Sequence, residues 1–120
     1  MFIELTRVFK FDASHRLPKV GSEHKCARLH GHTYGLEVTV AGEVSEEIGW
    51  LMDYAEINRV VCPVIEMLDH THLNDVPGLD NPTSENLALW VWSKVKPSLP
   101  LLAEVCVWES ENSRCRYRGE

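Results

Sequence analysis

No stretch of the sequence approaches the roughly 20 apolar residues that a membrane-spanning helix requires. The first seven residues carry a glutamate and an arginine where a secretory signal peptide would be apolar. The four cysteines are scattered and form no CxxC pair, so they do not indicate a disulfide framework. We therefore expect a cytoplasmic protein without membrane contact, in which most thiols are buried small side chains.

Basic residues are also scarce, because 12 lysines and arginines face 18 aspartates and glutamates, for a net charge of −6. This balance argues against nucleic-acid binding, which requires a basic surface. Residues 14–32 are the exception, with a local charge of +3 that leaves −9 for the rest of the chain. The segment is either a solvated loop or a docking point for a small anionic substrate. Its basic side chains are Arg16, Lys19, Lys25 and Arg28.

The length of 120 residues, the absence of repeats and linkers, and an ordinary 44% of apolar residues predict one domain, residues 1–120. β-Forming residues from Phe2 to Ser14 predict a first strand, and apolar alternation over 34–40 predicts a second. Two further strands are expected at about 101–109 and 113–118.

Two helices are expected between these pairs of strands. Asp53 can cap the first, with Glu56 reaching back in a capping box, and Pro63 should kink it. Thr83 or Ser84 can cap the second, which Pro97 ends. The order β-β-α-α-β-β predicts an α+β fold with both helices on one face of an antiparallel sheet. The side chains expected to be buried are Tyr54, Ile57, Val61, Val64, Ile65 and Leu68 in the first helix, and Leu87, Trp90, Val91 and Val95 in the second.

Three histidines form a candidate metal site. His30 and His32 occupy alternate positions at the start of the second strand, so both side chains point to one face. His15 ends the first strand, and antiparallel pairing would bring it alongside. Three imidazoles with an open fourth position are the donor set of catalytic zinc. The alternative is that these histidines are surface or hydrogen-bonding residues.

Cys26 precedes His30 by four residues. A thiol beside a divalent cation and basic side chains is favoured as the thiolate, a usable base or nucleophile. It could instead be a fourth zinc ligand, which would close the site. His24 has no comparable setting and is expected to be exposed.

Two acidic positions are further candidates. Asp69 beside His70 can support acid–base chemistry, or the pair can mark a solvated helix end. Glu109 follows an apolar strand, where it either marks the exit to water or accepts two parallel hydrogen bonds from a guanidine-like heterocycle edge.

These residues fall in short motifs: FDASHR at 11–16, CARLHGH at 26–32, LDH at 68–70, PTSE at 82–85, and the strand that ends in Glu109. Together, and in this order, they closely resemble the 6-pyruvoyl-tetrahydropterin synthase family over nearly the whole chain. The three-residue gap between Cys26 and His30, with the thiol retained, resembles the queuosine branch of that family.

The resemblance implies a set of roles and an assembly. Zn²⁺ would be bound by the three histidines, Cys26 would be the catalytic base, and Asp69 with His70 would be a second proton-transfer element. The fold would be the tunnelling fold, in which sheets join into a barrel within a homohexamer that has active sites at subunit interfaces. The expected substrate contacts are Glu109, Thr83, Ser84, Glu85, Arg16 and Lys25.

The implied reaction converts 7,8-dihydroneopterin triphosphate into 6-carboxy-5,6,7,8-tetrahydropterin, acetaldehyde and triphosphate. Two alternatives stay open from the sequence. One is the same zinc chemistry stopping at 6-pyruvoyl-tetrahydropterin. The other is a zinc- or pterin-binding domain without catalysis.

Overall fold

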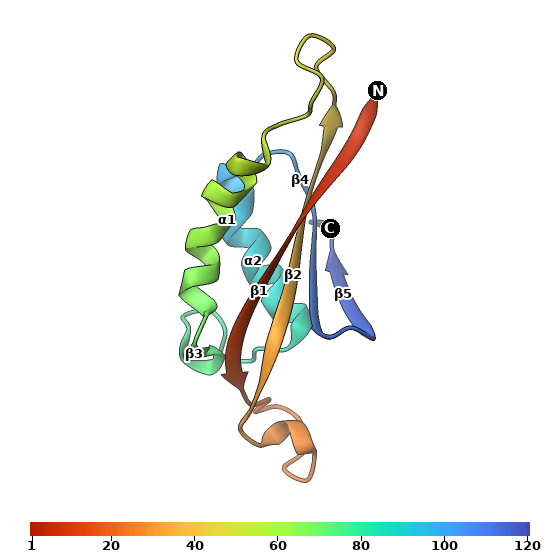
Figure 1. The fold of residues 1–120 in the computed structure, drawn as a ribbon. Helices are drawn as coiled ribbons and strands as arrows, with labels where there is room; N and C mark the ends of the chain where they lie inside the picture. Colours follow the sequence, from red (N-terminus) through yellow and green to blue (C-terminus); the bar gives the residue numbers. More distant parts are fainter.

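The computed structural model, which describes residues 1–120, contains a five-stranded sheet with two α-helices packed on one face (Figure 1). The strand order is β3-β1-β2-β4-β5. The α+β architecture expected from the sequence is therefore confirmed. The strands are β1 (Phe2–His15), β2 (His30–Glu43), β3 (Thr71–His72), β4 (Leu102–Ser110) and β5 (Ser113–Tyr117), and the helices are α1 (Tyr54–Leu68) and α2 (Ser84–Val95).

The short strand β3 was not expected from the sequence. It pairs with β1 in parallel through Ala13 with Thr71 and Ser14 with His72, whereas all other pairings are antiparallel. Two residues are too few to show a periodic pattern, so this strand is specified by its position after α1 and not by its own sequence. The sheet is antiparallel as expected except for this one parallel pair at its edge.

The long β1–β2 pair sets the geometry of the molecule. Its register runs without interruption from Phe2 opposite Glu43 to His15 opposite His30. Because side chains alternate between faces, His15 and His30 share the face that carries the helices. The segment 16–29 closes this end of the pair and contains a single 3₁₀ turn, Lys25–Ala27.

The core lies between this face of the sheet and the two helices. The predicted inward residues of α2 are all buried, and in α1 the exceptions are Tyr54, which is 46% exposed, and Ile65, which is partly buried. Val60 is buried although the sequence pattern did not single it out. The fully buried side chains that join the layers include Leu36, Val38, Val105 and Val107 from the sheet, and Ile57, Val61, Leu87 and Val91 from the helices.

The helix caps are largely as expected. Asp53 caps α1 by accepting from the N–H of Ala55, and Thr83 caps α2 by accepting from the N–H of Asn86. The capping box is wrong, because the carboxylate of Glu56 binds Arg59 and does not reach back to Asp53.

Both prolines lie where the sequence analysis placed them relative to the helices. Helix α1 continues through Pro63 without a break. Helix α2 ends at Val95, but a 3₁₀ turn, Lys96–Ser98, carries the chain past Pro97.

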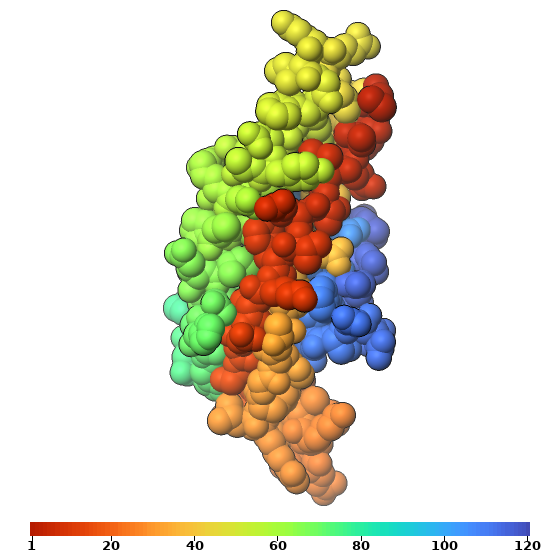
Figure 2. Space-filling view, viewed as in Figure 1, coloured from red at the N-terminus to blue at the C-terminus, as the bar shows by residue number.

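The molecule is elongated, with extents of 58 × 23 × 23 Å. The space-filling view shows both ends of the β1–β2 pair and their loops extending beyond the helices (Figure 2). Strand β1 pairs with β3 only at Ala13 and Ser14, so most of its length is an open sheet edge. Neither helix is long and apolar enough to cross a membrane.

Candidate metal centre and active site

The hairpin register brings three imidazoles together. His15 lies directly opposite His30, and His32 lies opposite Ala13 on the same face. The ligating nitrogens of the three histidines lie within 4.8 Å of one another. The Nε2 atoms of His15 and His30 are 3.0 Å apart, close to the roughly 3.3 Å between two nitrogens that share a tetrahedral zinc ion.

Backbone carbonyls determine which ring nitrogen of each imidazole is free. Nδ1 of His15 is 2.8 Å from the carbonyl oxygen of Pro82, and Nδ1 of His30 is 2.7 Å from that of Arg28. A carbonyl only accepts, so in the neutral rings both Nδ1 atoms carry the proton. Both Nε2 lone pairs therefore face each other, an arrangement that a cation between them would satisfy.

The surroundings of His32 also indicate a cation site. Nε2 of His32 is buried and makes no hydrogen bond, and its closest carboxylate, Oε2 of Glu109 at 3.4 Å, lacks hydrogen-bond geometry. Buried polar atoms in proteins are almost always paired. Three converging lone pairs fit a divalent metal ion, so the His15–His30–His32 cluster can bind a metal.

Burial favours the neutral form of the His15 imidazole. This side chain is only 1% exposed, and desolvation lowers its pKa below the ordinary value, against smaller raising effects from Pro82 and Glu109. A neutral imidazole is the species that binds metal.

Cys26 lies beside the metal centre. Its cavity, of about 330 Å³, is lined by Lys25, Cys26, His30, His32 and Glu109. The thiol is not a member of the three-histidine cluster, so Cys26 lies beside the candidate metal ligands and outside their set. His24 is exposed, as expected, and accepts a hydrogen bond from the N–H of Cys26.

Glu109 joins this cavity to a second one of about 460 Å³. The hydroxyl of Ser84 donates to Oε1 of Glu109 at 3.2 Å. The first cavity contains His30, His32 and a thiol, the second contains hydroxyls, and the carboxylate of Glu109 lines both. The residues that line the second cavity are Ser84, Glu85, Val107, Glu109, Ser110, Ser113, Arg114 and Cys115.

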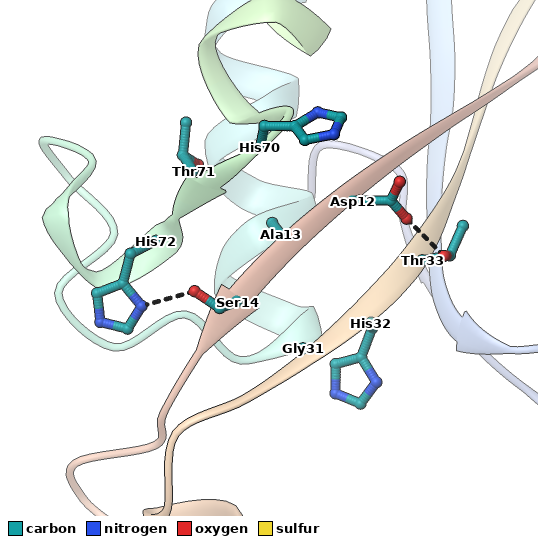
Figure 3. A pocket seen from close by; sticks show the side chains of 9 residues that line it. All are labelled: Asp12, Ala13, Ser14, Gly31, His32, Thr33, His70, Thr71 and His72. Carbon is teal, nitrogen blue, oxygen red and sulfur yellow. Dashed lines mark hydrogen bonds between the residues drawn. The ribbon is translucent and has the colours of Figure 1, made fainter.

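Asp69 and His70 do not line the cavity of Cys26. His70 lines a third cavity of about 630 Å³, together with Asp12 and Thr33 from the helix-free face of the sheet (Figure 3). Cys26 is not part of this cavity. Within one chain, the structure therefore does not bring Asp69 and His70 together with Cys26 in a single cavity.

The backbone of Asp12 fixes the Asp69–His70 turn. Its N–H donates to Oδ1 of Asp69, and its carbonyl accepts from the N–H of His70. The first of these bonds, helped by the His70 ring 3.0 Å away, lowers the pKa of Asp69 below its ordinary value. His70 has a φ of 59°, an uncommon left-handed conformation for a non-glycine residue.

The other predicted substrate contacts lie in different surroundings. Glu85 lines the second cavity, whereas Thr83 uses its hydroxyl as a helix cap. Arg16 is exposed, and its backbone is held by the side chain of Asn74. Lys25 is the member of the basic segment that lines the cavity of Cys26.

Several residues near these cavities were missed by the sequence analysis. Tyr34 has a detectable signal, because it continues the two-residue spacing of His30 and His32 on one face of β2. Arg114 and Cys115 have none, because each reaches the site only through long-range packing, and Pro82 belongs to the PTSE motif but was given no role.

Comparisons with known proteins agree with this geometry. Residues 4–120 match the family model described as 6-pyruvoyl tetrahydropterin synthase. A 6-pyruvoyl tetrahydrobiopterin synthase of Dictyostelium discoideum is 42% identical, over 97% of this chain and 96% of its own length. A dihydroneopterin monophosphate aldolase of Pyrococcus furiosus is 40% identical, over 82% of each chain.

A third relative and one solved structure are also similar to this chain. A 6-carboxy-5,6,7,8-tetrahydropterin synthase of Synechocystis is 39% identical, over 91% of this chain and 88% of its own. The structure of the Caenorhabditis elegans 6-pyruvoyl tetrahydropterin synthase superimposes with a TM-score of 0.91 at 28% identity, covering 100% of this chain and 97% of that one. The motifs, the fold and the relatives agree, and the chain belongs to the 6-pyruvoyl tetrahydropterin synthase family.

Proposed function

We propose that this protein is a zinc-dependent lyase that converts 7,8-dihydroneopterin triphosphate and water into 6-carboxy-5,6,7,8-tetrahydropterin, acetaldehyde and triphosphate, a step of queuosine biosynthesis. The observation that carries the proposal is the shared space around Glu109. The thiol of Cys26 and the imidazoles of His30 and His32 line one cavity beside this carboxylate, and hydroxyls line the other.

Each side of this space suits one part of the substrate. The carboxylate of Glu109, held by Ser84, can accept two parallel hydrogen bonds from the amino-pyrimidine edge of a pterin. The three-carbon side chain would then extend toward His30, His32 and Cys26. Lys25 provides positive charge in the same cavity for the substrate's phosphates.

The proposed chemistry is proton transfer next to a polarised oxygen. Bound zinc supplies a Lewis acid for the oxygens of the substrate side chain. The thiolate of Cys26 removes the neighbouring carbon-bound proton. Because Cys26 lies outside the ligand cluster, it is free to act as a base, which favours an enzyme over a structural zinc domain with Cys26 as fourth ligand.

Asp69 and His70 require a second chain to join this chemistry. His70 lines a different cavity of the protomer from Cys26, and Asp69 adjoins His70, so we propose that a neighbouring subunit of a homohexamer presents them to Cys26. The open edges of β1 and β5 are suited to joining sheets into a barrel, which would satisfy their unpaired backbone groups.

The product of the reaction distinguishes the two candidate branches of the family. The short gap between Cys26 and His30 and the Synechocystis relative support the carboxy product. The Dictyostelium relative, at 42% identity, favours 6-pyruvoyl-tetrahydropterin as the second candidate. The two activities share the metal centre and diverge only after triphosphate has left.

Product analysis tests the proposal. The zinc-loaded protein is incubated with 7,8-dihydroneopterin triphosphate, and products are identified by mass spectrometry. We expect carboxytetrahydropterin and acetaldehyde from the wild type and a loss of at least about 100-fold in Cys26→Ala, the size of a general-base contribution. Cys62→Ala, which removes an exposed thiol of α1 outside the three cavities, is the matched control and should keep full activity.

The other outcomes are equally informative. Pyruvoyl product alone would assign the second candidate, and an aldol cleavage product would assign the activity named for the Pyrococcus relative. Unchanged substrate with zinc still bound would contradict the enzyme and leave a zinc- or pterin-binding domain.

A further inference from the structure

Tyr34 approaches the metal centre from inside the core. It follows His30 and His32 at the same two-residue interval on β2 and is 0% exposed. Its hydroxyl lies 3.1 Å from Nδ1 of His15. Its ring meets the rings of His15 and His32 edge-on, with centroids 5.9 and 5.4 Å away. Tyr34 therefore contacts the ligand set without lining any of the three cavities around it.

Packing fixes this side chain. Phe11, its cross-strand neighbour, stacks on the ring at 5.0 Å with an interplanar angle of 11°. A buried hydroxyl needs a hydrogen-bond partner, and His15 is the partner that the structure provides.

Nδ1 of His15 thus has two oxygen neighbours. The carbonyl of Pro82, at 2.8 Å, can only accept, so the proton of the neutral ring lies on Nδ1. The hydroxyl oxygen of Tyr34 is close enough to share that proton. A proton held on Nδ1 leaves the lone pair on Nε2, the atom that lies 3.0 Å from Nε2 of His30.

We propose that Tyr34 is a positioning residue of the metal centre, which together with Pro82 holds His15 as the Nδ1–H tautomer with Nε2 directed at the metal. The inference rests on the proposed metal function. His30 has a single carbonyl partner, contributed by the exposed Arg28 of the loop, whereas both partners of His15 are buried. His15 is therefore the rigid ligand of the three, and Tyr34 contributes to that rigidity.

Zinc affinity of Tyr34→Phe tests this role. The substitution keeps the ring and its stack on Phe11 and removes only the hydroxyl. Competition between the protein and a chromophoric chelator for Zn²⁺ should show binding weakened by about 10-fold, the lower end of the effect of removing an outer-shell partner. Tyr117→Phe is the matched control, because this tyrosine packs on Trp92 away from the histidines and should bind zinc like the wild type. Equal affinity in all three proteins would overturn the proposal.

A second measurement does not depend on the variant folding. Long-range ¹⁵N–¹H NMR of the metal-free wild type should show His15 as the Nδ1–H tautomer, and a predominantly Nε2–H ring would overturn the proposal. In a folded Tyr34→Phe protein the Nε2–H share should rise. His30→Ala tests the zinc centre separately from the role of Tyr34. It removes a proposed zinc ligand and should abolish zinc binding by the proposed centre. If the wild type binds no zinc, the proposed function fails, while an unchanged His15 tautomer in a folded Tyr34→Phe protein would overturn the role of Tyr34.

Discussion

At the scale of single residues, the helix-free face of the sheet depends on a glycine. Gly35 lies opposite Trp108, and the indole lies flat against it, because an added Cβ would be 1.9 Å from Cε2 of Trp108. The indole N–H donates to Oε2 of Glu37 at 3.1 Å. Arg114 binds the same carboxylate and lies over the ring, with Cζ 5.0 Å from the centroid.

Gly35→Ala should therefore destabilise the protein. The new methyl group would displace Trp108 from its place and separate it from Glu37. We expect a loss of about 1–3 kcal/mol in the free energy of unfolding, as for other overpacking substitutions, measured by urea denaturation. Gly21→Ala is the control, because nothing lies within 4 Å of its added Cβ, and it should change stability by less than about 0.5 kcal/mol. Equal stability of the two variants would contradict the packing argument.

At the scale of elements, the caps of the two helices have different consequences. Asp53 and Thr83 each satisfy one backbone N–H at the start of a helix. The α1 cap lies away from the three site cavities, whereas the α2 cap immediately precedes Ser84, which binds Glu109. The carbonyl of Pro82, one residue before the cap, lies 2.8 Å from Nδ1 of His15, a proposed metal ligand. The start of α2 thus links the metal centre to the proposed pterin pocket.

Paired alanine substitutions separate stability from function. Asp53→Ala and Thr83→Ala should each cost about 1 kcal/mol of stability through the lost cap. Only Thr83→Ala should also weaken pterin binding, because it loosens the segment that carries Ser84. Chemical denaturation and fluorescence titration with a pterin measure the two effects. Equal pterin affinity in both variants would show that the cap does not position the pocket.

The elements also show which features a sequence can predict. The caps at Asp53 and Thr83 and the spacing of His30 and His32 are local, so they could be predicted from neighbouring residues. Strand β3, the bond from His15 to Pro82 and the Arg59 partner of Glu56 depend on packing or on competing side chains. The resemblance supplied the roles of the site residues, but no local pattern indicates that His70 and Cys26 line separate cavities in one protomer.

At the scale of the whole molecule, the protomer is more extended than a typical domain of its length. Its radius of gyration is 15.6 Å, against about 13.6 Å for a compact chain of this size. The excess comes from the long β1–β2 pair, whose ends project beyond the helices (Figure 1). This shape suits a protein whose sheet is completed by neighbouring copies, as proposed above.

Mixing inactive variants tests whether neighbouring chains share a site. Cys26→Ala and His70→Ala proteins are each expected to be inactive. When they are unfolded and refolded together, random assembly should restore about a quarter of the wild-type activity, because a site needs an intact residue from each of two chains. Activity no higher than that of either parent would place both residues of a working site within one chain.

The open edge of β1 has a further consequence for the life of the protein in the cell. A protomer that lacks neighbours presents a long row of unpaired backbone N–H and C=O groups, which is the template for aggregation. Substitutions that weaken contacts between copies should therefore yield insoluble material and degradation fragments rather than a stock of folded, inactive monomers. The amount of protein that survives, and not its catalytic rate, would then be the first quantity to fall.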